Sequence, residues 1–110
     1  MTAYVIAMVR VDDPETYKKY TALTPALIEQ HGGKFLVRGG DIETLEGKTF
    51  EDRLVVLEFP SAEAVKTFYE SSGYQDAAAF RRASSEAVFL LAEGVADGAG
   101  APDAQVVKSG

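Results

Sequence analysis

Two segments with the character of β-strands, residues 3–11 (AYVIAMVRV) and 53–59 (RLVVLEF), are apolar on both of their faces. Side chains alternate sides along a strand, so each segment divides into two rows. In the first segment the rows are Val5, Ala7, Val9 and Val11 on one side and Tyr4, Ile6 and Met8 on the other. An antiparallel sheet with one face in water normally carries polar residues in one row. The sheet that these strands form must therefore be covered on both sides.

The segment after the first strand carries the signals of a helix that begins at Pro14. Asp12 and Asp13 supply acceptors for the N-cap, and proline fits the first helical position. A stripe of core-facing residues follows at three- and four-residue spacing: Tyr17, Tyr20, Thr24, Leu27, Ile28 and His31. Gly32 is expected to end this helix. Pro25 removes one helical hydrogen bond, which predicts a kink or a break inside it.

The rest of the chain supplies the remaining strands and helices. Residues 34–38 (KFLVR) are predicted to form a strand that residues 41–48 extend irregularly, and residues 86–93 (EAVFLLAE) the last strand. Ser61 is the expected N-cap of a helix that Gly73 ends, and residues 74–83 form a short helix. Residues 95–110 are rich in Gly, Ala and Asp, so we expect a flexible tail after a domain of residues 1–94.

The resulting order, βαββαβ, predicts an α+β domain of the ferredoxin-like class with a four-stranded antiparallel sheet. Both helices of this arrangement lie on one face of the sheet, which leaves the other apolar face bare. Soluble monomers rarely expose an apolar patch of that size. The simplest cover is a second copy of the chain packed sheet against sheet. We therefore expect a homodimer through the sheet face.

Composition excludes several classes of function. The net charge is −6 and no run of Lys or Arg occurs, which argues against nucleic acid or an anionic membrane as a partner. The chain has no cysteine, so thiolate nucleophiles, disulfides and Cys-ligated metals are excluded. The N-terminal stretch lacks a basic region and a continuous apolar run, so we expect no signal peptide and a cytoplasmic location.

The stretch HGGKFLVRGG, residues 31–40, holds two candidate functional residues. His31 could act as a general acid or base, or it could simply suit the end of a helix. Arg38, followed by Gly39 and Gly40, could present its guanidinium and backbone N–H groups to a carboxylate or enolate. The alternative is a β-bulge at the glycines, with Arg38 paired to a carboxylate such as Glu58.

The third candidate is Glu58, an acid inside an apolar run. If it were buried and unpaired it could carry a proton, although pairing with an arginine is the commoner role. The remaining candidates are residues that could line a helix–sheet pocket for a small-molecule ligand, tyrosines that could also be plain core residues among them: Tyr4, Tyr17, Tyr20, Tyr74, Gly39, Gly40 and Arg81. A single histidine without a cluster of acids is a poor ligand set, so no metal is expected. No nucleotide-binding motif occurs, and no cofactor is expected.

Three blocks of the sequence resemble the bacterial domain-of-unknown-function family 1330: AYVIAMVRVDDPETYKKY, HGGKFLVRGG and DRLVVLEFPSAEAVKTFYESSGYQDAAAFRR. The resemblance covers residues 3–94 and implies the dimeric α+β barrel fold. One departure is Ser71-Ser72-Gly73, where the family usually has Pro or Glu before the Tyr-Gln pair. Members of the wider superfamily include cofactor-independent monooxygenases, haem-degrading enzymes, muconolactone isomerase and dye-decolorising peroxidases.

Two functional hypotheses follow from the residues and the resemblance. The first is a cofactor-independent enzyme that acts on a small carbonyl- or enol-bearing metabolite by proton transfer or oxygenation. In that hypothesis His31 is the acid–base residue and Arg38 the anion anchor, while tyrosines line the pocket. The second is a non-catalytic ligand-binding or assembly domain, in which the same polar residues hold the dimer together.

Overall fold

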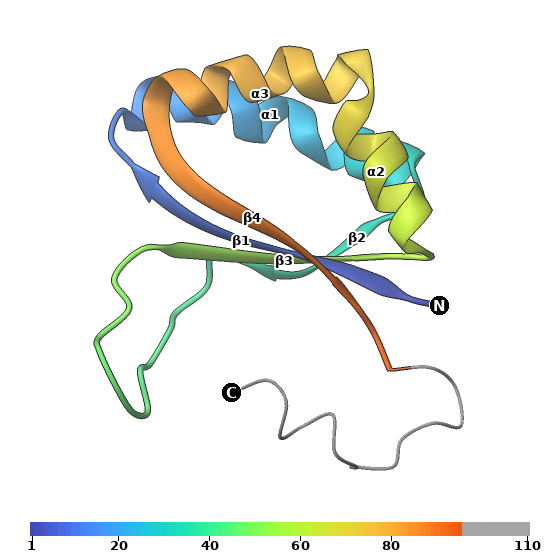
Figure 1. Cartoon of the computed structure of the whole chain (residues 1–110). Coiled ribbons are helices and arrows are strands. Elements are labelled where there is room, and N and C mark those ends of the chain that lie inside the picture. Colours follow the sequence, from blue (N-terminus) through green and yellow to red (C-terminus); the bar gives the residue numbers. More distant parts are fainter. Residues whose placement is uncertain (96–110) are drawn as a thin grey trace.

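The computed structural model describes residues 1–95 and contains four strands and three helices in the order β1-α1-β2-β3-α2-α3-β4 (Figure 1). The strands are β1 (Ala3–Val11), β2 (Lys34–Arg38), β3 (Arg53–Phe59) and β4 (Ser85–Glu93). The helices are α1 (Pro14–Gln30), α2 (Ala62–Glu70) and α3 (Ser72–Ser84). The predicted tail from residue 95 lies outside the described residues apart from Val95 itself.

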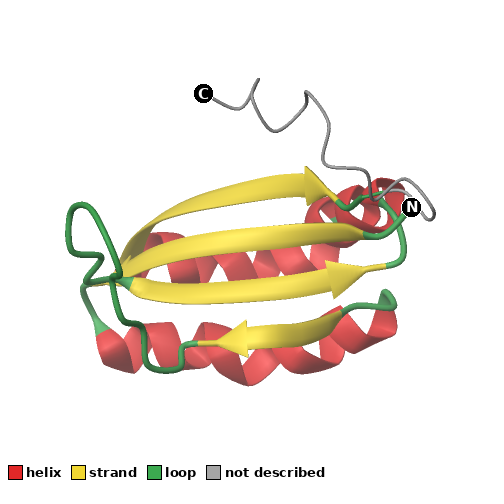
Figure 2. Ribbon diagram, turned by 90° about the horizontal axis from the view of Figure 1, so that it is seen from below, coloured by secondary structure: helices red, strands yellow, loops and turns green. Residues whose placement is uncertain are grey.

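The strands form one antiparallel sheet in the order β2-β3-β1-β4, and all three helices pack on the same face of it. Seen from below, the sheet lies in front with the helices behind it (Figure 2). This is the predicted ferredoxin-like α+β arrangement, with α2 and α3 together in the place of the second helix. The fold class is confirmed.

Helix α1 begins and ends as its sequence signals predict. The side chain of Asp13 accepts hydrogen bonds from the Thr16 backbone N–H at 3.3 Å and from the Thr16 hydroxyl at 2.7 Å. At the other end Gly32 takes a φ of 83°, which favours glycine, and the Gly33 N–H donates to the Ile28 carbonyl at 2.9 Å. The helix runs without interruption through Pro25, so of the predicted kink or break the break is wrong.

The boundary between α2 and α3 lies at Ser71, so the prediction that Gly73 ends the second helix is wrong. The Ser71 hydroxyl donates to the Phe68 carbonyl at 2.7 Å and accepts from the Tyr74 N–H at 3.2 Å. One side chain therefore ends α2 and caps α3. Gly73 instead lies in the first turn of α3, where a Cβ would come within 2.9 Å of the Leu27 side chain. Its small size permits the close packing of α1 against α3.

The segment 39–52 forms a loop, and the predicted strand extension at residues 41–48 is wrong. The Gly39 N–H still donates to the Leu54 carbonyl at 2.9 Å, which makes the last rung between β2 and β3. The chain then turns away from the sheet because Gly39 has a φ of 69°.

The two faces of the sheet differ in burial. On the helix side the β1 residues Ala3, Val5, Ala7 and Val9 are all buried. On the other side Ile6 lies between Val56 of β3 and Leu90 of β4, and the exposed fraction of Leu90 is 46%. Leu36 of β2 and Val88 of β4, at the two edges of the sheet, are 48% and 53% exposed. We call this surface, formed by Ile6, Met8, Leu36, Val37, Leu54, Val56, Val88 and Leu90, the bare face.

Candidate functional site: a cationic pocket between helix and sheet

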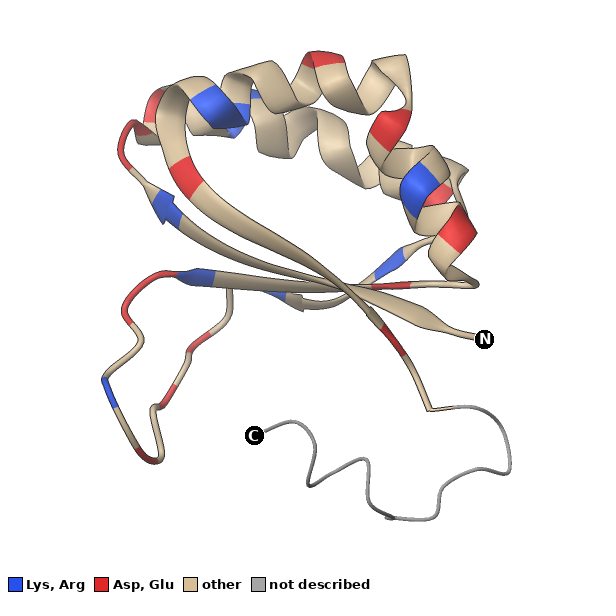
Figure 3. Cartoon of the chain, viewed as in Figure 1, with Lys and Arg blue, Asp and Glu red and all other residues tan. Residues whose placement is uncertain are grey.

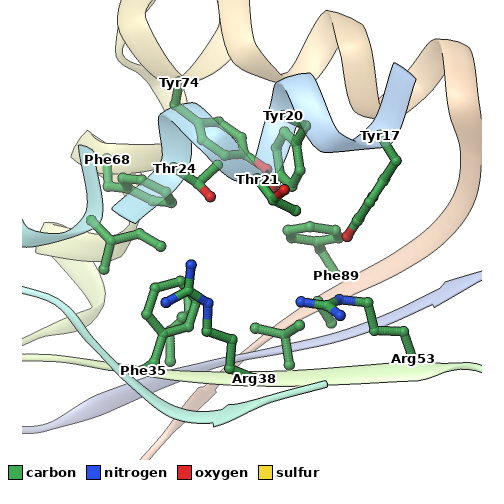
Figure 4. Close-up of a pocket in the computed structure, with 14 residues that line it drawn as sticks. Tyr17, Tyr20, Thr21, Thr24, Phe35, Arg38, Arg53, Phe68, Tyr74 and Phe89 are labelled. Atoms are coloured by element: carbon green, nitrogen blue, oxygen red, sulfur yellow. Dashed lines mark hydrogen bonds between the residues drawn. The ribbon is translucent and has the colours of Figure 1, made fainter. Parts of the chain in front are cut away.

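A pocket lies between α1 and the helix-facing side of the sheet (Figure 4). The residues that line it are Ala7, Tyr17, Tyr20, Thr21, Thr24, Ile28, Phe35, Arg38, Arg53, Val55, Leu57, Phe68, Tyr74 and Phe89. The cavity volume is about 40 Å³. At roughly 10–15 Å³ for each water, that space holds a few water molecules or a very small ligand. Arg38 is an exposed residue of this lining.

A β-bulge in β2 aims Arg38 at this pocket. Phe35 lies opposite Leu57 on the helix side of the sheet, and Val37 lies opposite Val56 on the bare face. Regular alternation from Phe35 would place Arg38 on the bare face as well, but the extra residue shifts the register and sets Arg38 opposite Val55. The guanidinium then lies over the Phe35 ring, 4.3 Å from its centre. The alternative prediction placed a bulge at the Gly39-Gly40 pair, whereas the observed bulge precedes that pair.

Arg53, the first residue of β3, brings a second guanidinium to the same pocket. It lies 5.9 Å from the centre of the Tyr17 ring, and its Nε is buried without a hydrogen-bond partner among the described residues. Gly39 makes this position available, because a Cβ there would occupy the place of the Arg53 guanidinium. Figure 4 shows Arg38 and Arg53 rising from the sheet toward α1.

The cationic groups of the pocket have no carboxylate partner within residues 1–95. The salt bridges in this part of the chain join Arg10 with Asp12 and Glu86, Lys18 with Glu15, and Lys34 with Glu58. Arg38 and Arg53 take part in none of them, although the chain carries 17 acidic residues. Within residues 1–95 the acidic residues lie on the helices, at the turn before α1, on the 39–52 loop and on the strands β3 and β4 (Figure 3). The pocket therefore presents uncompensated positive charge to whatever enters it.

Opposite the arginines, the helix side of the pocket carries hydroxyl groups. The Tyr20 and Tyr74 hydroxyls lie 2.8 Å apart and join α1 to α3. Burial raises the pKa of Tyr20 above its ordinary value, and the adjacent Tyr74 adds to this rise. Burial also raises the pKa of Tyr17, although the positive charge of Arg53 opposes the rise. Both phenols stay neutral at physiological pH and can donate hydrogen bonds.

Of the residues predicted for a site, Arg38, Tyr17, Tyr20 and Tyr74 line the pocket. Arg81 lies directly behind it: the residue is 7% exposed, its guanidinium lies 4.3 Å from the centre of the Phe89 ring, and its Nε has no partner among the described residues.

His31, the proposed acid–base residue, lies outside the pocket lining. It caps the C-terminal end of α1, and its Nδ1 lies 2.9 Å from the Leu27 carbonyl. Its ring packs edge-on against Phe68, with the ring centres 5.7 Å apart. Phe68 therefore stands between the imidazole and the pocket, and the structure does not bring His31 together with Arg38.

Glu58 and Tyr4 face each other across β3 and β1 on the side of the sheet opposite the pocket. Glu58 pairs with Lys34 at 3.4 Å, not with any of the arginines expected as partners. Gly40 has open space around it and is not part of the lining.

Three residues of the pocket lining were not predicted as site residues from the sequence: Arg53, Thr21 and Thr24. The threonines lie on the pocket side of α1, and the helical spacing of Thr24 was the one available signal.

No group of three His, Asp or Glu residues within residues 1–95 is arranged to hold a metal ion. In the same part of the chain no helix is both long and apolar enough to span a membrane.

Fold and site together define a ferredoxin-like α+β domain with a cationic pocket between its helices and its sheet. Residues 2–95 match the family described as "Domain of unknown function (DUF1330)", and the chain belongs to that family. No curated protein matches the chain in sequence.

Several solved structures share the fold. A protein of unknown function from Rhodopseudomonas palustris is 20% identical, with a TM-score of 0.72 over 86% of this chain and 83% of that one. A dimeric ferredoxin-like protein of unknown function from Jannaschia sp. CCS1 is 14% identical, with a TM-score of 0.66 over 86% of this chain and 100% of that one. SnoaB, a cofactor-independent oxygenase from Streptomyces nogalater, is 19% identical, with a TM-score of 0.58 over 84% of this chain and 92% of that one.

Proposed function

We propose that the pocket binds the anion of a small carbonyl- or enol-bearing metabolite, and that the protein is a cofactor-independent enzyme acting on that anion by proton transfer or oxygenation. One observation carries the proposal. Arg38 and Arg53 enter the same pocket and neither forms a salt bridge with the described residues. A partly buried cation without a partner, such as Arg53, is costly, and an anionic ligand offsets that cost.

The chemistry follows from the kinds of groups that line the pocket. Among the described residues, the lining offers guanidiniums and neutral hydroxyls but no carboxylate or imidazole. Guanidiniums and hydroxyls stabilise a bound enolate, and this stabilisation lowers the pKa of the carbon acid from which it forms. The released proton passes to water. An enolate formed in this way is the common starting point for isomerisation and for direct reaction with dioxygen. SnoaB, which shares the fold, is an oxygenase that works without a cofactor.

We propose in addition that the protein is a homodimer through its bare face. Leu36, Val88 and Leu90 on this face are each 46–53% exposed in the single chain. Contact with a second copy removes this apolar surface from water. The Jannaschia protein of the same fold is dimeric, as is a ferredoxin-like protein of unknown function from Bacteroides fragilis with a TM-score of 0.54.

The binding proposal is tested with a matched pair of probes. Acetoacetate is small, planar as its enol and negatively charged, whereas acetoacetamide has nearly the same shape without the charge. Calorimetry is expected to show acetoacetate binding well above that of acetoacetamide. Arg38→Gln and Arg53→Gln should each weaken acetoacetate binding about tenfold or more, because each removes a charge-assisted hydrogen bond. Arg82→Gln, a change to an exposed arginine of α3, is the control. Equal binding of the two probes would contradict the proposal.

The catalytic part is tested by exchange of the acetoacetate methylene protons in D₂O, followed by NMR. The wild-type protein is expected to accelerate this exchange, and Arg38→Gln to abolish the acceleration. His31→Ala should leave the exchange rate unchanged, because the imidazole does not reach the pocket. Binding of acetoacetate without faster exchange would make the protein a non-catalytic ligand-binding domain.

A further inference from the structure

The loop of residues 39–52 connects the two cationic residues of the pocket. Arg38 is the last residue of β2 and Arg53 the first residue of β3, and no helix or strand lies between them. The two guanidiniums therefore depend on the backbone at the two ends of one loop. Gly39, the first loop residue, is also the residue against which the Arg53 guanidinium lies. A contact that fixes this loop fixes the mouth of the pocket.

The tip of this loop is ordered and apolar. The Phe50 N–H donates to the Thr44 hydroxyl at 2.9 Å, and Gly47 makes a turn with a φ of 93°. Leu45, between Thr44 and Gly47, is 89% exposed, and the nearby Ile42 is 38% exposed. We call Ile42 and Leu45 the loop tip. An exposed leucine contributes no hydrophobic stabilisation to the single chain, whereas its burial against another surface would contribute favourable free energy.

The loop extends from the sheet on the side away from the helices (Figure 1). This is also the side of the bare face, where Ile6, Val56 and Leu90 lie together. A molecule that covers the bare face thus approaches from the same direction as the loop. In a symmetric pair of chains, each copy offers one bare face and one loop to the other.

We infer that a second copy of this chain buries the loop tip, and that this contact sets the positions of Arg38 and Arg53 in the pocket. The inference rests on the proposed function and adds a regulatory link to it: the pocket binds its anion well only in the dimer. Linkage is reciprocal, so anion binding also strengthens the dimer by the same factor. A second copy is the occupant because one partner covers both the loop tip and the bare face, and two solved proteins of this fold are dimeric.

The test uses the double variant Ile42→Ser/Leu45→Ser, which removes the apolar tip and leaves Arg38, Arg53 and the bare face unchanged. The matched control is Glu46→Ser/Lys48→Ser, which alters two exposed polar residues of the same loop. Sedimentation velocity over a dilution series gives the dimer dissociation constant. The tip variant should dissociate about tenfold more readily or more, because two isoleucines and two leucines per dimer lose their burial. The control should dissociate like the wild type.

Acetoacetate binding is then measured at protein concentrations above and below the dissociation constant. The wild-type protein should bind acetoacetate more weakly below its dissociation constant than above it. The tip variant should bind weakly at both concentrations, because its loop lacks the apolar contact even in the dimer. An unchanged dissociation constant in the tip variant would overturn the inference. Wild-type binding that does not change with protein concentration would overturn it as well, because the pocket would then not depend on the dimer.

Two further measurements keep this test separate from the proposed function. Hydrogen exchange of the 39–52 amides, and modification of Arg38 and Arg53 by phenylglyoxal mapped by mass spectrometry, need no bound probe. Both should slow as the wild-type protein dimerises, while modification of Arg82 stays constant. If acetoacetate fails to bind but these rates follow dimerisation, the binding proposal fails and the loop contact stands. If the exchange and modification rates do not change on dimerisation, the inferred loop contact is wrong.

Discussion

The hydroxyl oxygens of Tyr20 and Tyr74 lie 2.8 Å apart in the interior, so that one hydrogen bond joins α1 to α3 above the pocket. The two residues are 8% and 1% exposed, which leaves neither hydroxyl an easy route to water. Their rings also meet edge to face, with centres 6.1 Å apart. This contact combines the packing of two aromatic rings with a hydrogen bond in which each hydroxyl is the partner of the other.

Removing one member of this pair should cost more than removing both. Tyr74→Phe leaves the Tyr20 hydroxyl buried without its partner, and we expect the free energy of unfolding to fall by about 1–3 kcal/mol. Tyr20→Phe should behave similarly. The double variant should be closer to the wild type than either single variant, because no hydroxyl is then left unpaired. Chemical denaturation of the four proteins measures this cycle, and additive losses would show that the hydroxyls act independently.

The same burial predicts a loss of stability at alkaline pH. Burial raises the pKa of Tyr20 and Tyr17 in the folded protein above the ordinary value of 10.0. Below that value both phenols are neutral in the folded and unfolded chains, and stability does not depend on them. As the pH rises above about 10, the unfolded chain loses these protons more readily and the folded state is disfavoured.

Absorbance titration of the five tyrosines should show this behaviour directly. At least two of them should ionise only above the ordinary range, together with the loss of the folded signal in circular dichroism. Tyr20→Phe should shift the alkaline unfolding transition to higher pH when it is compared at equal starting stability. Ionisation of all five tyrosines near pH 10 in the folded protein would contradict the burial described here.

Gly39 and Gly40 offer a matched pair of substitutions. Gly39→Ala introduces a side chain at a φ of 69° and in the place of the Arg53 guanidinium. We expect a loss of about 1–3 kcal/mol in the free energy of unfolding and weaker acetoacetate binding, because Arg53 must move. Gly40→Ala meets no atom within 4 Å and should change neither quantity. Denaturation and calorimetry compare the two, and equal effects would refute the role given to Gly39.

A charge on the bare face should separate the proposed dimer. Val56→Glu places a carboxylate between Ile6 and Val37 at the centre of this face. Burying that charge twice in a symmetric interface should weaken association at least about a hundredfold. The control is Leu23→Glu on α1, where the leucine is 46% exposed on the helix side. Sedimentation velocity should show a monomer for the first variant only, whereas dimerisation of both would place the interface elsewhere.

The strands were predictable because their signals are local. Residues 3–11, 34–38 and 53–59 are continuous β-branched and apolar runs, and the structure has strands over the same residues. The loop at residues 41–48 was mistaken for strand because Ile42 and Leu45 are apolar, but their spacing of three does not alternate as a strand requires. The α2–α3 boundary was misplaced because a Gly is the usual helix stop, while the hydroxyl of Ser71 performs that task here.

The site was predictable only in part, since its members meet through the sheet register. Arg38 was a candidate from its place at the end of an apolar strand, and its aim into the pocket depends on a bulge with no clear sequence signature. Arg53 carries no local signal, because it faces the pocket only through pairing and the absence of a side chain at Gly39. His31 shares the helical stripe of Tyr17 and Tyr20, yet the last turn directs its ring to its own helix.

The single additional residue in β2 determines on which face of the sheet Arg38 lies. With that residue, the guanidinium of Arg38 enters the pocket under the helices. With strict alternation it would lie on the bare face, between the two copies of the proposed dimer. Homologous proteins can have an arginine at the same position of a sequence alignment and yet differ by one residue in this strand. In one of them the arginine would then face the pocket, and in the other it would face the dimer interface. Homologues should therefore be compared by the face of the sheet on which the arginine lies, because only an arginine on the pocket face can bind an anion there.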